Sequence, residues 1–177
     1  MDAIALLKIQ LQHAREWMAG TVADVTDDMA HWIPPGVANP LGATYAHLVV
    51  SEDMIVNGML KQNPPLFATS WAGKTGLSEP MPLPGPDWKD YGSWARRVQI
   101  DLPALWQYAG AVQANTDEYL NSLSPEALDT PVDLSNVGFG EVTVGWIIGR
   151  LLIGHIDNEC GEISCLKGLQ GVRGYPG

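Results

Sequence analysis

Apolar positions recur at helical spacing in four stretches of the chain, which are separated by segments rich in proline, glycine and polar residues. The four stretches are 2–24, 42–61, 87–122 and 143–167. In the first stretch, apolar residues at intervals of three and four form one stripe, which is typical of an amphipathic helix packed on a core. In the third stretch we expect a break at Asp101, because this residue can cap a new helix and Pro103 fits its first turn. The pattern therefore predicts an all-α protein.

The segments between the predicted helices are of very unequal length. The segments 26–40, 62–86 and 124–143 interrupt the helical period with proline and glycine, so we predict loops there. A segment as long as 62–86 without its own period is uncommon in a domain unless it works as a functional loop or lid. Four helices with such connections predict a four-helix bundle with long inter-helix loops, forming a single domain over 1–177. We expect the last helix to stop at Gly168, as a C′ glycine, and a Gly-rich C-terminal tail to cover 168–177.

Charge and composition narrow the possible partners. With 20 acidic and 10 basic residues, the net charge of -10 argues against nucleic acid and against an anionic membrane surface. The chain has no apolar run long enough for a membrane span, and its first residues do not resemble a signal peptide. Cys160 and Cys165 lie about 140° apart on one predicted helix, which is too far apart for a disulfide. We therefore expect a cytoplasmic protein with two free thiols.

Polar residues stand on the apolar faces of two predicted helices. His155 and Glu159 are one turn apart on the same face of the last helix, and Glu162 lies at the edge of that face. His47 lies on or beside the apolar stripe of the helix over 42–61. A buried carboxylate needs a cation or a proton. Two histidines and one glutamate from facing helices would suit a divalent metal ion with open coordination positions, as in a catalytic zinc site.

Two other interpretations of these residues are a metal-free role, which stays possible, and a ferritin-like di-iron site, which is excluded. A histidine on an apolar face is more often a hydrogen-bonded core residue, and a His–Glu pair four residues apart can be an ordinary helix-surface pair. A ferritin-like di-iron site requires Glu-x-x-His on two helices, and this sequence contains no such motif. The residues alone leave both a metal site and a metal-free pair possible.

Three motifs carry a resemblance to a known family. They are "WIPPG" at 32–36, "ATYAHLVVSED" at 43–53 and "GHIDNECGEISCLKGLQG" at 154–171. In this order and spacing, over essentially the whole chain, the sequence resembles the DinB-like superfamily of metal-dependent bundle proteins. The resemblance implies a metal, often nickel or zinc, held by one histidine matching His47 and by a His-x-x-x-His motif. The first histidine of that motif matches His155, and the second falls on Glu159.

Glu159 stands where the family has a histidine, and this difference has two possible consequences for metal binding. A set of two histidines and one carboxylate still binds a divalent ion and favours harder metals than three imidazoles do. Alternatively, the site has degenerated and holds no metal. Characterised relatives include transferases that use low-molecular-weight thiols such as mycothiol or bacillithiol, and thiol-dependent isomerases, in which the metal holds the thiol as a thiolate.

The resemblance therefore implies a metal-dependent thiol S-transferase or a hydrolase that acts on a small molecule. His47, His155 and Glu159 would hold a divalent ion, and no catalytic residue is predicted. The alternative is a non-catalytic binding or regulatory bundle protein with a degenerate, metal-free site.

Further residues and a dimer complete the expectations. Glu162 would either orient a metal ligand or be a solvated residue. Trp32 and Tyr45 would either help to wall a substrate pocket or pack in the core, which is the more common role of such aromatic residues. Relatives are often dimers, so we also expect a homodimer.

Overall fold

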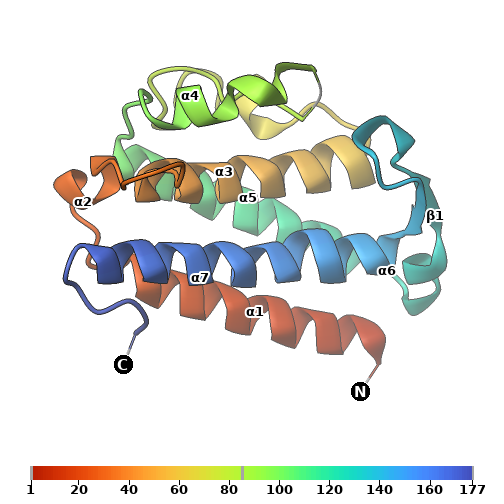
Figure 1. Ribbon diagram of the computed structural model, residues 1–177. Helices are drawn as coiled ribbons and strands as arrows, with labels where there is room; N and C mark the ends of the chain where they lie inside the picture. Colours follow the sequence, from red (N-terminus) through yellow and green to blue (C-terminus); the bar gives the residue numbers. More distant parts are fainter. Residues whose placement is uncertain (1, 85, 177) are drawn as a thin grey trace.

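Four long helices form the body of the computed structural model, which describes residues 2–84 and 86–176 (Figure 1). The long helices are α1 (Ala3–Val22), α3 (Leu41–Asp53), α5 (Leu102–Ser122) and α7 (Gly154–Leu169). Helix α7 packs against both α1 and α3, and α3 also packs against α5. The prediction of an all-α bundle with long connections is confirmed.

Shorter elements occupy the connections between the long helices. They are α2 (Asp27–His31), η1 (Met54–Leu60), η2 (Leu66–Ala68), η3 (Pro86–Asp90), α4 (Tyr91–Ala95), η4 (Pro125–Asp129), β1 (Pro131–Asp133), η5 (Ser135–Val137), β2 (Glu141–Thr143), α6 (Val144–Trp146) and η6 (Ile147–Ile153). The antiparallel pair of β1 and β2, with Val132 opposite Val142, lies at the end of the bundle next to α6 (Figure 1). The segment that carries α4 lies along the outer side of α3 (Figure 1).

Side-chain caps explain where three of the helical runs begin. The carboxylates of Asp2 and Asp101 accept hydrogen bonds from the backbone amides three residues later, at 2.8 and 3.1 Å. The hydroxyl of Thr143 does the same for Trp146 at 3.2 Å, so the last helical run starts at Val144. Each bond satisfies an amide that has no partner inside its helix. The predicted break at Asp101 is therefore confirmed.

The structure corrects three predicted boundaries. The segment 26–40 is not all loop, because Thr26 caps the short helix α2, whose five residues are too few to show a period. The stretch 87–100 is not one helix, because α4 ends at Ala95 and the amide of Ile100 donates to Nε2 of His31 at 2.9 Å. At the other end of the chain, α7 continues through Gly168 to Leu169, and the left-handed turn falls on Gly171.

Two of the long helical runs contain a π-helical segment. Helix α3 continues into η1, and η6 joins α6 to α7, so each run holds seven consecutive π-helical residues. In η6, for example, the amide of Gly154 donates to the carbonyl of Gly149, five residues earlier. η1 and η6 also contact each other. π-helical segments are rare in proteins, and those that occur are often found at functional sites. The contact between η1 and η6 therefore indicates a candidate functional region in this part of the bundle.

A group of charged and polar residues, here called the Arg15 network, joins three helices. Arg15 of α1 forms an ion pair with Glu52 of α3 at 2.6 Å and another with Asp117 of α5 at 2.6 Å. Thr116 of α5 donates to Glu52 at 2.8 Å. The side chains of Arg15 and Glu52 are 8% and 7% exposed, whereas that of Asp117 is 55% exposed. The network therefore fixes α1 and α5 to one face of α3.

The segment 62–86 is attached to the rest of the chain at several points, of which two involve Asp53 and Gly76. Asp53, which is fully buried, accepts hydrogen bonds from the backbone amides of Leu66 and Phe67 at 2.9 and 3.0 Å. Further along, the carbonyl of Gly76 accepts from the amide of Asp101 at 2.8 Å. A Cβ on Gly76 would lie 2.6 Å from the carbonyl oxygen of Asp101, and the φ of Gly76 is +82°, so this position requires glycine. The first half of the predicted lid is therefore fixed in place.

The remaining sequence expectations about the chain concern its cysteines and its membrane propensity. Cys160 is buried and Cys165 is exposed, and both are free thiols, as predicted. Within residues 2–84 and 86–176, no helix is both long enough and apolar enough to cross a membrane.

Candidate metal site

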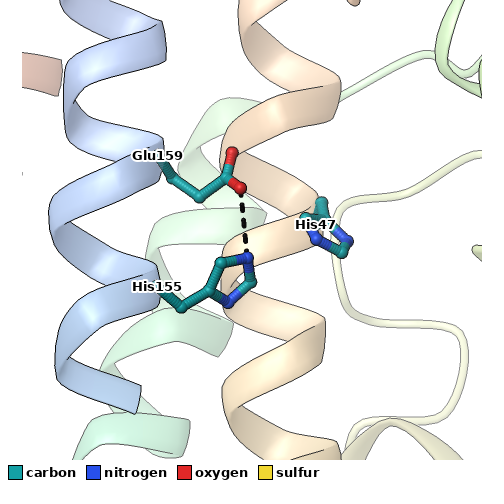
Figure 2. Close-up of side chains that lie close together, drawn as sticks. All are labelled: His47, His155 and Glu159. Atoms are coloured by element: carbon teal, nitrogen blue, oxygen red, sulfur yellow. Dashed lines mark hydrogen bonds and ion pairs between the residues drawn. The ribbon is translucent and has the colours of Figure 1, made fainter. Parts of the chain in front are cut away.

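His47, His155 and Glu159 come together where α3 packs against α7. Figure 2 shows His155 and Glu159 one turn apart on α7, with His47 opposite them on α3. Each residue offers one nitrogen or oxygen, and these three atoms lie within 4.8 Å of one another. All three residues are partly buried. The structure thus brings together the three side chains that the sequence selects as metal ligands.

The spacing of the three donor atoms is close to what a metal ion needs. Nitrogen and oxygen ligands lie about 2.0–2.2 Å from zinc, so two ligands of one ion are roughly 3.3–4.4 Å apart. Small side-chain rotations would bring the observed group into that range. In the structure, Nε2 of His155 lies 3.1 Å from Oε1 of Glu159, which makes a hydrogen bond (Figure 2). A bound ion would replace the proton that these two atoms share.

The surroundings of His47 keep its imidazole neutral. Burial, and to a lesser extent nearby His155, lower the pKa of His47, whereas Glu159 acts in the opposite direction, and the net result is a pKa of about 4. At neutral pH the ring therefore has a nitrogen lone pair to offer. Its Nδ1 lies 3.4 Å from the hydroxyl of Ser51, which leaves Nε2 for a ligand. This arrangement suits a metal-binding histidine, whose second nitrogen is usually held by a hydrogen bond.

Two aromatic rings, here called the aromatic cover, lie against His47. Trp88 of η3 and Tyr91 of α4 stack with ring centroids 4.6 Å apart and planes inclined by 17°. Their centroids are 5.6 and 5.3 Å from that of His47. Burial raises the pKa of Tyr91, and the carboxylates of Glu159 and Glu162 raise it further, so its phenol stays protonated. The aromatic cover shields His47 on one side of the candidate metal triad, which consists of His47, His155 and Glu159, from water.

A pocket of about 280 Å³ opens beside the two histidines. It is bordered by His47, Ser51, Met54, Ile55, Met59, Pro84, Trp88, Phe139, Arg150, Leu151, His155 and Asn158. Most of these residues are apolar, and a few polar groups stand among them, which is the usual character of a small-molecule site. A larger groove of about 600 Å³ between α1 and α5 is bordered by none of the three candidate ligands.

The other predicted site residues lie differently from what we expected. Glu162 is exposed and accepts a hydrogen bond from the hydroxyl of Thr44 at 3.3 Å rather than one from His155. Partial burial of its carboxyl and the charge of Glu159 raise the pKa of Glu162. Its role as an orienting residue therefore has no support from the hydrogen bonds of the described residues.

Trp32 and Tyr45 do not border the pocket beside His47. Tyr45 is only two residues from His47, which on a helix places it about 200° away, on the opposite face. There it is 7% exposed and borders a small cavity next to Arg15. Trp32 follows α2 and packs against the hydrophobic core. The expectation that these two aromatic residues wall the pocket is not met.

Several residues that border the pocket were not predicted from the sequence. Trp88 and Phe139 come from irregular segments that have no period to follow. Asn158 follows His155 by three residues, so helical spacing could have placed it on the same face. Arg150 precedes His155 by five residues, and an α-helix would turn it away. Its position depends on the π-helical register of η6.

Comparisons with known proteins agree with this fold. Residues 10–156 match the family model of the DinB superfamily, a range that includes both histidines and ends before Glu159. Among curated proteins, none matches the chain. Among solved structures, the chain is similar to a crystal structure of a conserved protein from Enterococcus faecalis, with 23% identity and a TM-score of 0.77 over 96% of this chain and 97% of that one. At this level of identity the likeness shows a shared fold alone.

Proposed function

The chain belongs to the DinB superfamily, and from this premise and the geometry of its triad we propose that it is an enzyme working with a divalent metal ion. The grouping of His47, His155 and Glu159 within 4.8 Å, next to a pocket, is the observation that carries the proposal. Its substrate is a small molecule. The net charge of -10 supports neither nucleic acid nor an anionic membrane as a partner.

Each residue of the site has a defined part in this proposal. His47 offers a neutral nitrogen, and Ser51 fixes the orientation of its ring. His155 and Glu159 supply the other two ligands from one face of α7. When bound, an ion with open positions would lower the pKa of a thiol or a water molecule, as a low-molecular-weight-thiol S-transferase or a hydrolase requires. Zinc or nickel is the expected ion, and the carboxylate also makes the site suitable for harder ions.

One observation favours a second candidate function, a non-catalytic binding or regulatory protein. The hydrogen bond between His155 and Glu159 at 3.1 Å satisfies both side chains without an ion. At 21% and 15% exposure, the two side chains also keep some contact with solvent. In this case the glutamate marks a site that has lost its metal.

Metal analysis of the purified protein separates the two candidates. The protein would be prepared without an affinity-tag nickel column and without chelator, and then titrated with Zn²⁺, Ni²⁺ and Mn²⁺. We expect close to one equivalent of bound ion, and we expect His155→Ala to weaken binding by about 100-fold or more, because a ligand is lost. His13→Ala, which removes an exposed histidine on α1, is the matched control and should bind as the wild type does. Uptake below about a tenth of an equivalent would reject the enzyme proposal in favour of the metal-free protein.

A further inference from the structure

Among the described residues that border the pocket beside the triad, Arg150 is the one with a permanent positive charge. These described residues include no aspartate and no glutamate. The ion pairs found within residues 2–84 and 86–176 do not include Arg150. Glu159 lies next to the pocket through its hydrogen bond with His155 at 3.1 Å but does not border it. In a protein of net charge -10, Arg150 is therefore a local positive group on the pocket wall.

The π-helical register of η6 explains why Arg150 shares a face with His155. In an α-helix, residues five apart point about 140° away from each other. In a π-helix, the hydrogen bonds join residues five apart, so such residues lie one above the other. The bond from the Gly154 amide to the Gly149 carbonyl has this spacing. A Cβ on Gly154 would lie 3.7 Å from Nη1 of Arg150, so the guanidinium extends along the backbone next to His155.

The rest of the pocket wall is mainly apolar. Met54, Ile55 and Met59 of η1 border it from one helix, and Leu151 borders it from η6. Pro84, Trp88 of the aromatic cover and Phe139, which precedes β2, are the other apolar residues described at the pocket. A volume of about 280 Å³ lies at the small end of the range for small-molecule sites. The wall therefore fits a compact apolar body, and methionine side chains adapt well to varied shapes.

The head group that suits Arg150 is a carboxylate. A guanidinium presents its N–H groups in a planar fork that matches the two oxygens of a carboxylate. A single arginine carries a single charge, which balances a monoanion. Asn158, at the same pocket, can add an amide N–H to the pair.

We propose that Arg150 binds the carboxylate of a small substrate whose apolar body lies along the wall formed by η1 and Phe139. Bound in this way, the rest of the substrate extends toward His47 and His155. The inference deepens the proposed function and rests on it for the reaction, because it names the substrate class of the same site. Arg150 is a binding and specificity residue in this arrangement, and the carboxylate contact does not itself require a metal ion.

Pairs of acids and their amides test the proposal directly. The probes are 3-phenylpropanoate and hexanoate, each compared with its neutral amide, and binding is measured by calorimetry. The proteins are the wild type, Arg150→Gln, Arg150→Lys and Arg173→Gln, each freed of metal by chelator and each loaded with Zn²⁺. Arg173→Gln is the matched control, because Arg173 is exposed in the tail and does not border the pocket.

We expect the wild type and Arg173→Gln to bind each acid about tenfold or more tightly than its amide, since a charge-assisted bond is lost in the amide. Arg150→Gln should bring the ratio close to one in both metal states, and Arg150→Lys should restore part of it. Because Arg150 is exposed, the melting temperatures of its variants should stay near that of the wild type.

Three results would overturn the proposal: equal binding of acid and amide by the wild type, no binding of either acid, or an acid preference that survives in Arg150→Gln. If Arg150→Gln kept its preference for the acid over the amide only when loaded with zinc, the ligand's carboxylate would bind the metal ion. This result would reject Arg150 as the partner of the carboxylate. Zinc uptake, measured separately on the same proteins, reports on the metal proposal alone. A lack of uptake with an intact acid preference in metal-free protein would reject the enzyme proposal and keep the carboxylate site.

Discussion

Helix α3 contributes to two polar clusters with opposite characters, the Arg15 network and the group formed by His47, His155 and Glu159. Glu52, in the Arg15 network, accepts hydrogen bonds from Arg15 and Thr116, and its side chain is 7% exposed. Glu159, in the triad, shares one hydrogen bond with His155 beside a pocket, and its side chain is 15% exposed. Glu52 and His47 are five residues apart on α3, so they point about 140° away from each other.

The difference between the two clusters suggests that one face of α3 contributes mainly to the stability of the fold and the other face to the candidate site. On one face of α3, the buried Glu52 pairs with Arg15 and accepts from Thr116, and removing Glu52 leaves the buried guanidinium of Arg15 with the exposed Asp117 as its charged partner. On the other face of α3, His47 lies next to His155 and Glu159 of α7, and these three side chains offer nitrogen and oxygen atoms within 4.8 Å of one another that could hold a metal ion. Variants on the first face should therefore change folding, and variants on the second should change ligand binding.

The largest effect should come from Glu52→Ala. This change leaves Arg15 buried and paired only with the half-exposed Asp117, so we expect the free energy of unfolding to fall by about 3–5 kcal/mol. Urea denaturation followed by circular dichroism measures the loss. Asp117→Ala removes the exposed partner of the same arginine and should cost about 1 kcal/mol or less. Similar losses in the two variants would show that burial does not distinguish the two ion pairs.

A smaller, pH-dependent effect should come from His47. Burial lowers its pKa from 6.5 to about 4 in the folded protein, so between these values the unfolded chain binds a proton that the folded chain does not. Stability should therefore decrease as the pH falls through this window, by at most about 1.4 kcal/mol per pH unit from this residue. Denaturation of metal-free protein between pH 7 and pH 4 tests this. His47→Gln should show a shallower slope than the wild type, whereas His13→Gln should match it; parallel curves for all three would contradict the buried, neutral state of His47.

The smallest effect on folding should come from Glu159→Gln. The His155–Glu159 pair is partly exposed, so its loss in metal-free protein should change the free energy of unfolding by less than about 1 kcal/mol. The same position should matter more for the metal. Glu159→His restores the three-imidazole set implied by the family resemblance, and we expect it to raise the preference for Ni²⁺ over Mn²⁺ by about tenfold, because imidazole suits nickel better than manganese. Competition titrations measure this ratio, and an unchanged ratio would mean that residue 159 is not a ligand.

Helical spacing alone predicted much of the fold and of the triad. The four long helices, the cap at Asp101 and the shared face of His155 and Glu159 all follow from local periodicity. The pocket wall could not be predicted in the same way, because Trp88 and Phe139 come from segments in which no period links sequence to position. Tyr45 was misplaced although its spacing from His47 already puts it on the opposite face.

The π-helical segments were the main feature that the sequence pattern did not reveal. Their residues are mostly apolar, with Asn57 and Arg150 among them, and residues of these types also occur in α-helices, so composition does not indicate the register. The two segments contact each other in the folded bundle. Arg150 borders the pocket through the π-helical register of η6, and a purely α-helical interpretation of the sequence leaves it outside.

The facing π segments also bear on how this protein could diverge over generations. A π-helical hydrogen bond spans one more residue than an α-helical one. If one residue of η6 between Arg150 and His155 were deleted and the bonding became α-helical, the two side chains would be four residues apart and would stay on the same face. If the deleted residue preceded Arg150, the two would stay five residues apart in an α-helix and would point about 140° away from each other. The position of a one-residue deletion within η6 would therefore decide whether an arginine remains beside His155.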